Sequence, residues 1–161
     1  MFRSTLMRFR AFAATLVAIL ACASATGAQA SQSASDPRAA LDHFIAAFNA
    51  LDWKAFRACL GDSASLFNPD IPGAVSLHRL DGRPEIERSF RVVFGPNPDG
   101  SANAGPNITP TNVRVQQFSD TAVVTFEFTR RNHSFGRRTI VMNRGAGGWL
   151  IVHIHASNVS E

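Results

Sequence analysis

The last third of the chain, residues 108–157, limits the possible folds more than any other part of the sequence. It contains four segments rich in β-branched and aromatic residues, and glycine-rich or polar turns separate them. Segments of this composition and spacing are typical of consecutive antiparallel strands. We therefore expect a meander of four strands at 108–118, 121–131, 137–144 and 149–157.

The part before this meander predicts helices rather than a second sheet. Apolar residues recur at helical spacing behind Asp36-Pro37, and a shorter apolar face follows Asp52. A third helix is expected from Pro84, after a possible strand at 75–80, and residues 95–106 read as a mobile loop. Three helices followed by a meander predict one α+β domain at residues 36–158, with the helices on one face of a curved sheet.

Residues 1–30 predict a secretory signal peptide. Three arginines precede an apolar run of about 12 residues, which is short for a membrane span of about 20, and the segment ends in Ala28-Gln29-Ala30. We expect cleavage after Ala30 and a periplasmic or secreted protein without a membrane span. Acylation at Cys22, within Ile19-Leu20-Ala21-Cys22, is the alternative.

The net charge of the expected mature protein is close to zero and gives no support for binding to nucleic acid. Removal of residues 1–30 leaves 13 basic and 12 acidic residues, a net charge of +1, and the basic residues form no stripe. Cys59 is the only cysteine beyond Cys22, so the mature chain cannot form an internal disulfide. Its apolar neighbours predict a buried thiol rather than a nucleophile.

Three parts of the sequence resemble a known family. The run 148–157, Gly-Trp-Leu-Ile-Val-His-Ile-His-Ala-Ser, is similar to the last strand of SnoaL-like proteins and of the association domain of calcium/calmodulin-dependent kinase. Residues 80–86 resemble the start of the third helix of SnoaL-like chains, and residues 48–53 resemble their first-helix pattern. The resemblance implies the cone-shaped nuclear transport factor 2-like fold, with a mostly antiparallel sheet and a pocket at its open end. It also implies a homodimer, because proteins of this fold commonly form dimers through the sheet.

A polar cluster on the last strands is the predicted site. Strict alternation places Trp149, His153 and His155 on one face of the strand 149–157, which we expect to line the pocket. It places Leu150, Val152, Ile154 and Ala156 on the other face, which we expect a homodimer to bury. Assumed hairpins at 145–148 and 131–136 pair Arg144 with Trp149 and Glu127 with Ile140. They bring Arg138 and Glu127 to the same face, although a slip of one residue would move Glu127 across the sheet. The predicted acid/base residues are His153, His155 and Glu127, and the predicted ligand-binding residues are Trp53, Phe56, Phe67, Arg138 and Trp149.

Two functions follow as expectations. One is a pocket for a small apolar or carbonyl-containing molecule, which could support isomerase or lyase activity, and the other is a non-catalytic homo-oligomerisation module. A buried network that only satisfies its own hydrogen bonds is the alternative for the polar cluster. His153 and His155 could chelate zinc with His78 or Glu127, but because the sequence fixes no third ligand we expect neither metal nor cofactor. The chain has no tyrosine, which excludes the usual tyrosine-donating oxyanion hole of ketosteroid isomerases.

Overall fold

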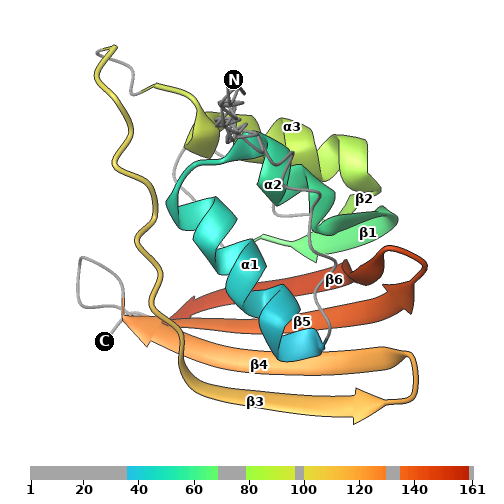
Figure 1. Ribbon diagram of the computed structural model, residues 1–161. Helices are drawn as coiled ribbons and strands as arrows, with labels where there is room; N and C mark the ends of the chain where they lie inside the picture. Colours follow the sequence, from blue (N-terminus) through green and yellow to red (C-terminus); the bar gives the residue numbers. More distant parts are fainter. Residues whose placement is uncertain (1–35, 69–78, 97–99, 130–134, 160–161) are drawn as a thin grey trace, which may run out of the picture. The chain divides into compact units, whose positions relative to one another are not determined.

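The computed structural model describes residues 36–68, 79–96, 100–129 and 135–159. They form three helices and six strands in the expected α+β order (Figure 1). The predicted signal peptide and most of the possible strand at 75–80 lie outside the described residues. The elements are α1 (Pro37–Asn49), α2 (Trp53–Ala58), β1 (Leu60–Phe67), β2 (Leu80–Asp81), α3 (Arg83–Phe94), β3 (Thr111–Phe118), β4 (Thr121–Thr129), β5 (Phe135–Gly145) and β6 (Gly148–Val159).

The six strands make one sheet in the order β2-β1-β6-β5-β4-β3. Strands β3 to β6 form the expected antiparallel meander, and β1 joins its open edge by pairing in parallel with β6. Helix α1 crosses one face of this curved sheet (Figure 1). The fold is therefore the mostly antiparallel α+β arrangement that the sequence predicts.

The first two helices each begin at a capping aspartate. The Asp36 carboxylate accepts a hydrogen bond from the Ala39 N–H at 2.9 Å, and Asp52 does the same for Ala55 at 2.9 Å. Each carboxylate satisfies one of the amide groups that a first helical turn leaves without a partner. These two caps confirm the predicted starts of the first two helices.

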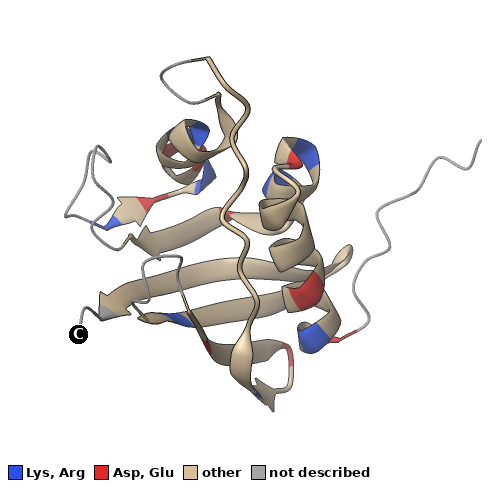
Figure 2. Cartoon of the chain, turned by 90° about the vertical axis from the view of Figure 1, so that its left-hand side faces the viewer, with Lys and Arg blue, Asp and Glu red and all other residues tan. Residues whose placement is uncertain are grey.

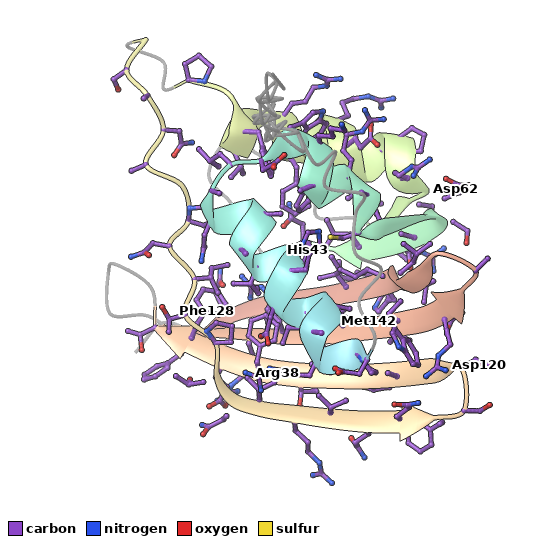
Figure 3. The ribbon with its side chains drawn as sticks, viewed as in Figure 1. Arg38, His43, Asp62, Asp120, Phe128 and Met142 are labelled. Atoms are coloured by element: carbon purple, nitrogen blue, oxygen red, sulfur yellow. The ribbon has the colours of Figure 1, made fainter. Side chains whose placement is uncertain are left out.

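Aromatic side chains from the three helices pack into a single cluster above the sheet. Phe56 is fully buried at its centre, with ring centroids 5.5 Å from Phe44, 5.5 Å from Phe48 and 4.9 Å from Phe90. Figure 3 shows Phe128 and Met142 on the sheet side, and both are buried. The core thus lies between the helices and one face of the sheet, and this inner face carries the apolar residues.

A β-bulge interrupts the alternation of β6. Met142 pairs with Ile151 but the next residue back, Val141, pairs with His153, so Val152 is the extra residue. Before the bulge Trp149 and Ile151 are buried, and after it Ile154 and Ala156 are buried instead. The predicted apolar face of Leu150, Val152, Ile154 and Ala156 is therefore wrong, because the bulge divides it between the two sides of the sheet.

Residues 101–110 form a strap, an irregular segment that runs beside α1 to the start of β3 (Figure 1). The Asn103 amide donates to the carbonyl of Val93 at 2.7 Å, near the end of α3. The Asn49 side chain, at the end of α1, both donates to the carbonyl and accepts from the N–H of Ile108, each at 2.7 Å. The part of the expected mobile loop from Asn103 onward is therefore tied to two helix ends.

Candidate ligand pocket

A cavity of about 80 Å³ lies between α1, α3, the strap and the inner face of the sheet. Four phenyl rings, several aliphatic side chains and two polar side chains line it. That volume accommodates several water molecules or a small organic group. The polar side chains are Arg138 from β5 and Asn68 from the end of β1, and the rings are those of Phe44, Phe48, Phe90 and Phe126.

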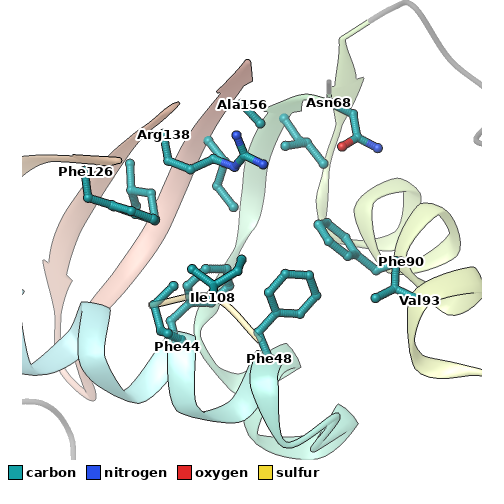
Figure 4. A pocket seen from close by; sticks show the side chains of 13 residues that line it. Phe44, Phe48, Asn68, Phe90, Val93, Ile108, Phe126, Arg138 and Ala156 are labelled. Carbon is teal, nitrogen blue, oxygen red and sulfur yellow. The ribbon is translucent and has the colours of Figure 1, made fainter. Parts of the chain in front are cut away.

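Arg138 brings the charge into this apolar space. Figure 4 shows its side chain extending from the sheet into the region between Phe126, Ala156 and the rings of Phe44 and Phe48. Its inward direction follows from the alternation of β5, because Arg138 lies in the same row as the buried Ile140 and Met142 and pairs with the buried Phe126 of β4. A guanidinium surrounded by phenyl rings can bind a carboxylate or carbonyl oxygen with little competition from water.

Three contacts fix the position of this guanidinium. Its Nη1 donates to the carbonyl oxygens of Arg137 at 2.8 Å and of Ser157 at 2.9 Å. Its central carbon lies 4.7 Å from the centre of the Phe128 ring, which is a cation–π distance. The Phe128 ring in turn packs on Gly136, the residue opposite it on β5, where a Cβ would come within 2.9 Å of three ring atoms. Gly136, Phe128 and Arg138 thus form a stack that holds the guanidinium at the cavity.

Arg138 is the one predicted site residue that lines the cavity. The expectation that the histidine face does so is wrong, because the bulge places His153 and His155 on the outer face of the sheet. Glu127 is also on the outer face, since the β4–β5 hairpin pairs it with Arg137 and not with Ile140. Its carboxylate accepts a hydrogen bond from Asn112 at 2.8 Å and lies 3.8 Å from the Arg137 Nε.

The four predicted apolar wall residues also lie away from the cavity lining. Phe56 is buried one layer behind it in the aromatic cluster, and Trp53 packs on Phe56 with a centroid distance of 6.0 Å. Trp149 is buried at the opposite end of β6 beneath the Arg144 guanidinium, which lies 4.8 Å from its ring centre. Phe67 is 41% exposed and lies on the outer face. Their expected role as pocket walls is therefore wrong.

The predicted histidines instead form an outer cluster with Ser65 and Phe67 of β1. The His153 Nδ1 lies 2.8 Å from the Ser65 hydroxyl oxygen, and the Phe67 ring centre lies 5.8 Å from His153 and 5.7 Å from His155. Partial burial lowers the pKa of His153, and repulsion from His155 and from Arg79 lowers it further. His153 is thus neutral near pH 7. Whether either histidine has a catalytic role stays a prediction.

Only some of the residues that line the pocket have a recognisable signal in the sequence. Phe44, Phe48 and Phe90 lie on the apolar helix faces that the periodicity identifies, so their burial could be predicted but not the cavity among them. Phe126 could be placed in the pocket wall only with the correct β4–β5 register, and Ile108 only with the contacts that hold the strap. Asn68 follows β1 directly and carries no distinguishing pattern in sequence.

Outside the pocket the described charges are dispersed. Figure 2 shows Lys, Arg, Asp and Glu spread over the helices and the ends of the strands, without a continuous stripe of one sign. Burial raises the pKa of the Cys59 thiol to about 11, and its Sγ donates to the Ala55 carbonyl at 3.3 Å. No described helix is long and apolar enough to cross a membrane.

Comparisons with known proteins agree with this architecture. A candidate dehydratase of the NTF2-like family from Streptomyces avermitilis superposes with a TM-score of 0.60 at 21% identity, over 76% of this chain and 93% of that one. A candidate calcium/calmodulin-dependent protein kinase type II association domain from Thiobacillus denitrificans gives 0.59 at 25% identity, over 77% and 95%. A candidate ketosteroid isomerase from Parabacteroides distasonis gives 0.59 at 18% identity, over 77% and 88%.

The sequence comparisons define the family. A search of curated protein sequences gave no significant match. The family profile of the SnoaL-like domain matches residues 38–161, which include all the described helices and strands. The chain therefore belongs to the SnoaL-like domain family, within the NTF2-like fold.

Proposed function

We propose that this chain binds a small, largely apolar molecule with a carboxylate or carbonyl group in the cavity beside Arg138. The observation that carries the proposal is one guanidinium placed among phenyl rings in a cavity of about 80 Å³. The rings would contact the apolar body of the ligand, and Arg138 would bind its oxygen atoms.

Binding is favoured over isomerase or lyase chemistry by the residues at hand. Among the described residues that line the cavity, none is a histidine or a carboxylate. Acid/base catalysis requires a group that accepts and returns a proton near neutral pH, and a guanidinium remains protonated in that range. The dehydratase and isomerase names therefore describe those structural neighbours, and they support a shared fold with this chain but not a shared activity.

A matched ligand series tests the proposal. We expect benzoate to raise the melting temperature more than benzaldehyde, and benzaldehyde more than toluene, because the three share a ring and differ in the group that meets Arg138. Arg138→Met keeps most of the side-chain length and removes the charge. Hydrogen bonds to a charged group contribute about 1.5–3 kcal/mol, so benzoate affinity should fall by roughly 10-fold to 100-fold.

Arg137→Met is the control for this experiment. Arg137 is the neighbouring arginine on β5, but its side chain is exposed on the outer face beside Glu127. Its replacement should leave benzoate binding unchanged. Equal stabilisation by benzoate and toluene, or equal losses in the two arginine variants, would refute the role of Arg138.

A second candidate function is homo-oligomerisation through the outer face of the sheet. The half-buried residues there are Val123 of β4, Val141 of β5, and Leu150 and Val152 of β6. Val123 and Val141 are directly paired in the sheet. Structural neighbours include an association domain and a kinase hub. Sedimentation velocity at micromolar concentration should show a dimer that Val141→Glu converts to a monomer. A wild-type monomer would exclude this candidate.

We also propose that residues 1–30 direct export and are removed. The basic, apolar and small-residue order of this segment supports the proposal, and the family match begins only at residue 38. The intact mass of the protein recovered from the periplasm or medium tests it. A mass that starts at Ser31 is expected, whereas an acylated Cys22 would contradict release.

A further inference from the structure

The outer face of β6 presents two imidazoles side by side. His153 and His155 alternate along the strand, so both project to the same side of the sheet. Both rings lie within 6 Å of one phenyl ring, that of Phe67 on the neighbouring parallel strand. This shared contact limits the positions of the two imidazoles before any ligand arrives.

A hydrogen bond orients the first of these rings. The Ser65 hydroxyl oxygen lies 2.8 Å from the His153 Nδ1, because Ser65 is directly paired with His153 in the sheet. When Nδ1–H donates to this oxygen, the lone pair of Nε2 is on the far side of the ring. Histidines that bind metal ions through one nitrogen usually donate the other N–H in this way.

We propose that His153 and His155 of one chain chelate a divalent late transition-metal ion on the outer face of the sheet. Imidazole nitrogen suits Cu²⁺, Ni²⁺ and Zn²⁺, whereas Mg²⁺ and Ca²⁺ require oxygen ligands. The described residues contain no group of three or more His, Cys, Asp and Glu side chains that could hold a metal ion, so among them the chelate has two protein ligands and water would fill its other positions. The site is an open chelate and not a closed structural centre.

One nearby charge opposes a cation at this position. Arg79 lies close enough to His153 to act on it electrostatically. Its guanidinium is neutralised by Asp81, with Nε–Oδ1 at 2.8 Å and Nη2–Oδ2 at 3.0 Å. Asp81 is paired with Ser65 across the sheet, so the carboxylate lies in the same row as His153 and offsets the repulsion from Arg79.

Calorimetric titration of the untagged protein with NiCl₂ tests the chelate. We expect one ion per chain in wild type. In His155→Ala the affinity should fall roughly tenfold or more, because the second ligand of a chelate binds intramolecularly. His155 is exposed, so this variant should keep the wild-type melting temperature. His43→Ala is the matched control, since His43 is an exposed histidine on α1 and its removal should change nothing.

The same titration distinguishes the alternatives. Affinity and stoichiometry unchanged in both His153→Ala and His155→Ala would overturn the site. One ion for every two chains would assign the ligands to two chains and overturn the single-chain chelate. Ser65→Ala should weaken Ni²⁺ binding by about tenfold, and wild-type affinity in that variant would overturn the orienting role of the hydroxyl group.

Discussion

Replacement of Gly136 by alanine should destabilise the protein through the Phe128 ring and not through the backbone. Gly136 is buried on β5, and its backbone angles are not of the left-handed kind that requires glycine. An added Cβ would lie 2.9 Å from the Phe128 Cε2 and closer still to two other ring atoms. Phe128 is only 5% exposed, so its ring has little free space to move into.

The expected size of the effect follows from two contributions. Overpacking of a filled core costs about 1–3 kcal/mol, and displacement of the ring also removes its cation–π contact with Arg138, which contributes about 0.5–2 kcal/mol. We therefore expect Gly136→Ala to lower the free energy of unfolding by about 1.5–5 kcal/mol. Urea unfolding followed by circular dichroism measures this difference.

A double-mutant cycle isolates the cause. In a Phe128→Ala background the added methyl group has no ring to meet, so Gly136→Ala should cost nothing or stabilise the strand by up to about 1 kcal/mol. Gly147→Ala is the matched control, because a Cβ at that turn position meets no atom within 4 Å. A Gly136→Ala variant as stable as wild type, or one with the same cost in both backgrounds, would refute the reasoning.

Three further expectations concern other parts of the chain. Asn49→Ala should lower the free energy of unfolding by about 1–3 kcal/mol in a urea titration, since it leaves two backbone groups of Ile108 without partners; a change below the error would contradict this role. Native Cys59 should react with iodoacetamide far more slowly at pH 8.5 than the urea-unfolded chain, because a pKa of about 11 keeps the thiol protonated, and equal rates would contradict its burial. Disruption of the exposed Arg38–Asp42 ion pair by Asp42→Ala should change stability by less than about 0.5 kcal/mol, and a larger loss in urea would show a role that its exposure does not indicate.

The sequence predicts the elements of the fold well because their signals are local. The helix caps at Asp36 and Asp52 need only the residues within one turn, and the four strands of the meander follow from composition and turn residues. The Arg144–Trp149 pairing was also predicted correctly, since Gly145 to Gly148 form a short and recognisable turn. The parallel pairing of β1 with β6 has no local signal of this kind, and it was expected only as part of the fold that the family resemblance implies.

The candidate site was predicted poorly because it depends on which side of the sheet each residue faces. One extra residue at Val152 reverses that assignment for the rest of β6, and no residue type there indicates a bulge. The β4–β5 hairpin pairs Glu127 with Arg137, three residues away from the expected partner Ile140, and this difference moves Glu127 to the outer face in the same way. Both errors are of an odd number of residues, so each one moves side chains from the interior to the surface.

Between its two anchors, the strap is the part of the pocket wall that can change at the smallest cost in stability. Most of the pocket wall belongs to the helices and the sheet, whose replacement would disturb the core, but Ile108 belongs to an irregular segment tied down by Asn49 and Asn103. Doubling the length of such a segment costs only about 0.6 kcal/mol in closure entropy. Exchanging residues 101–110 between family members is therefore a direct route to new ligand selectivity on an unchanged scaffold.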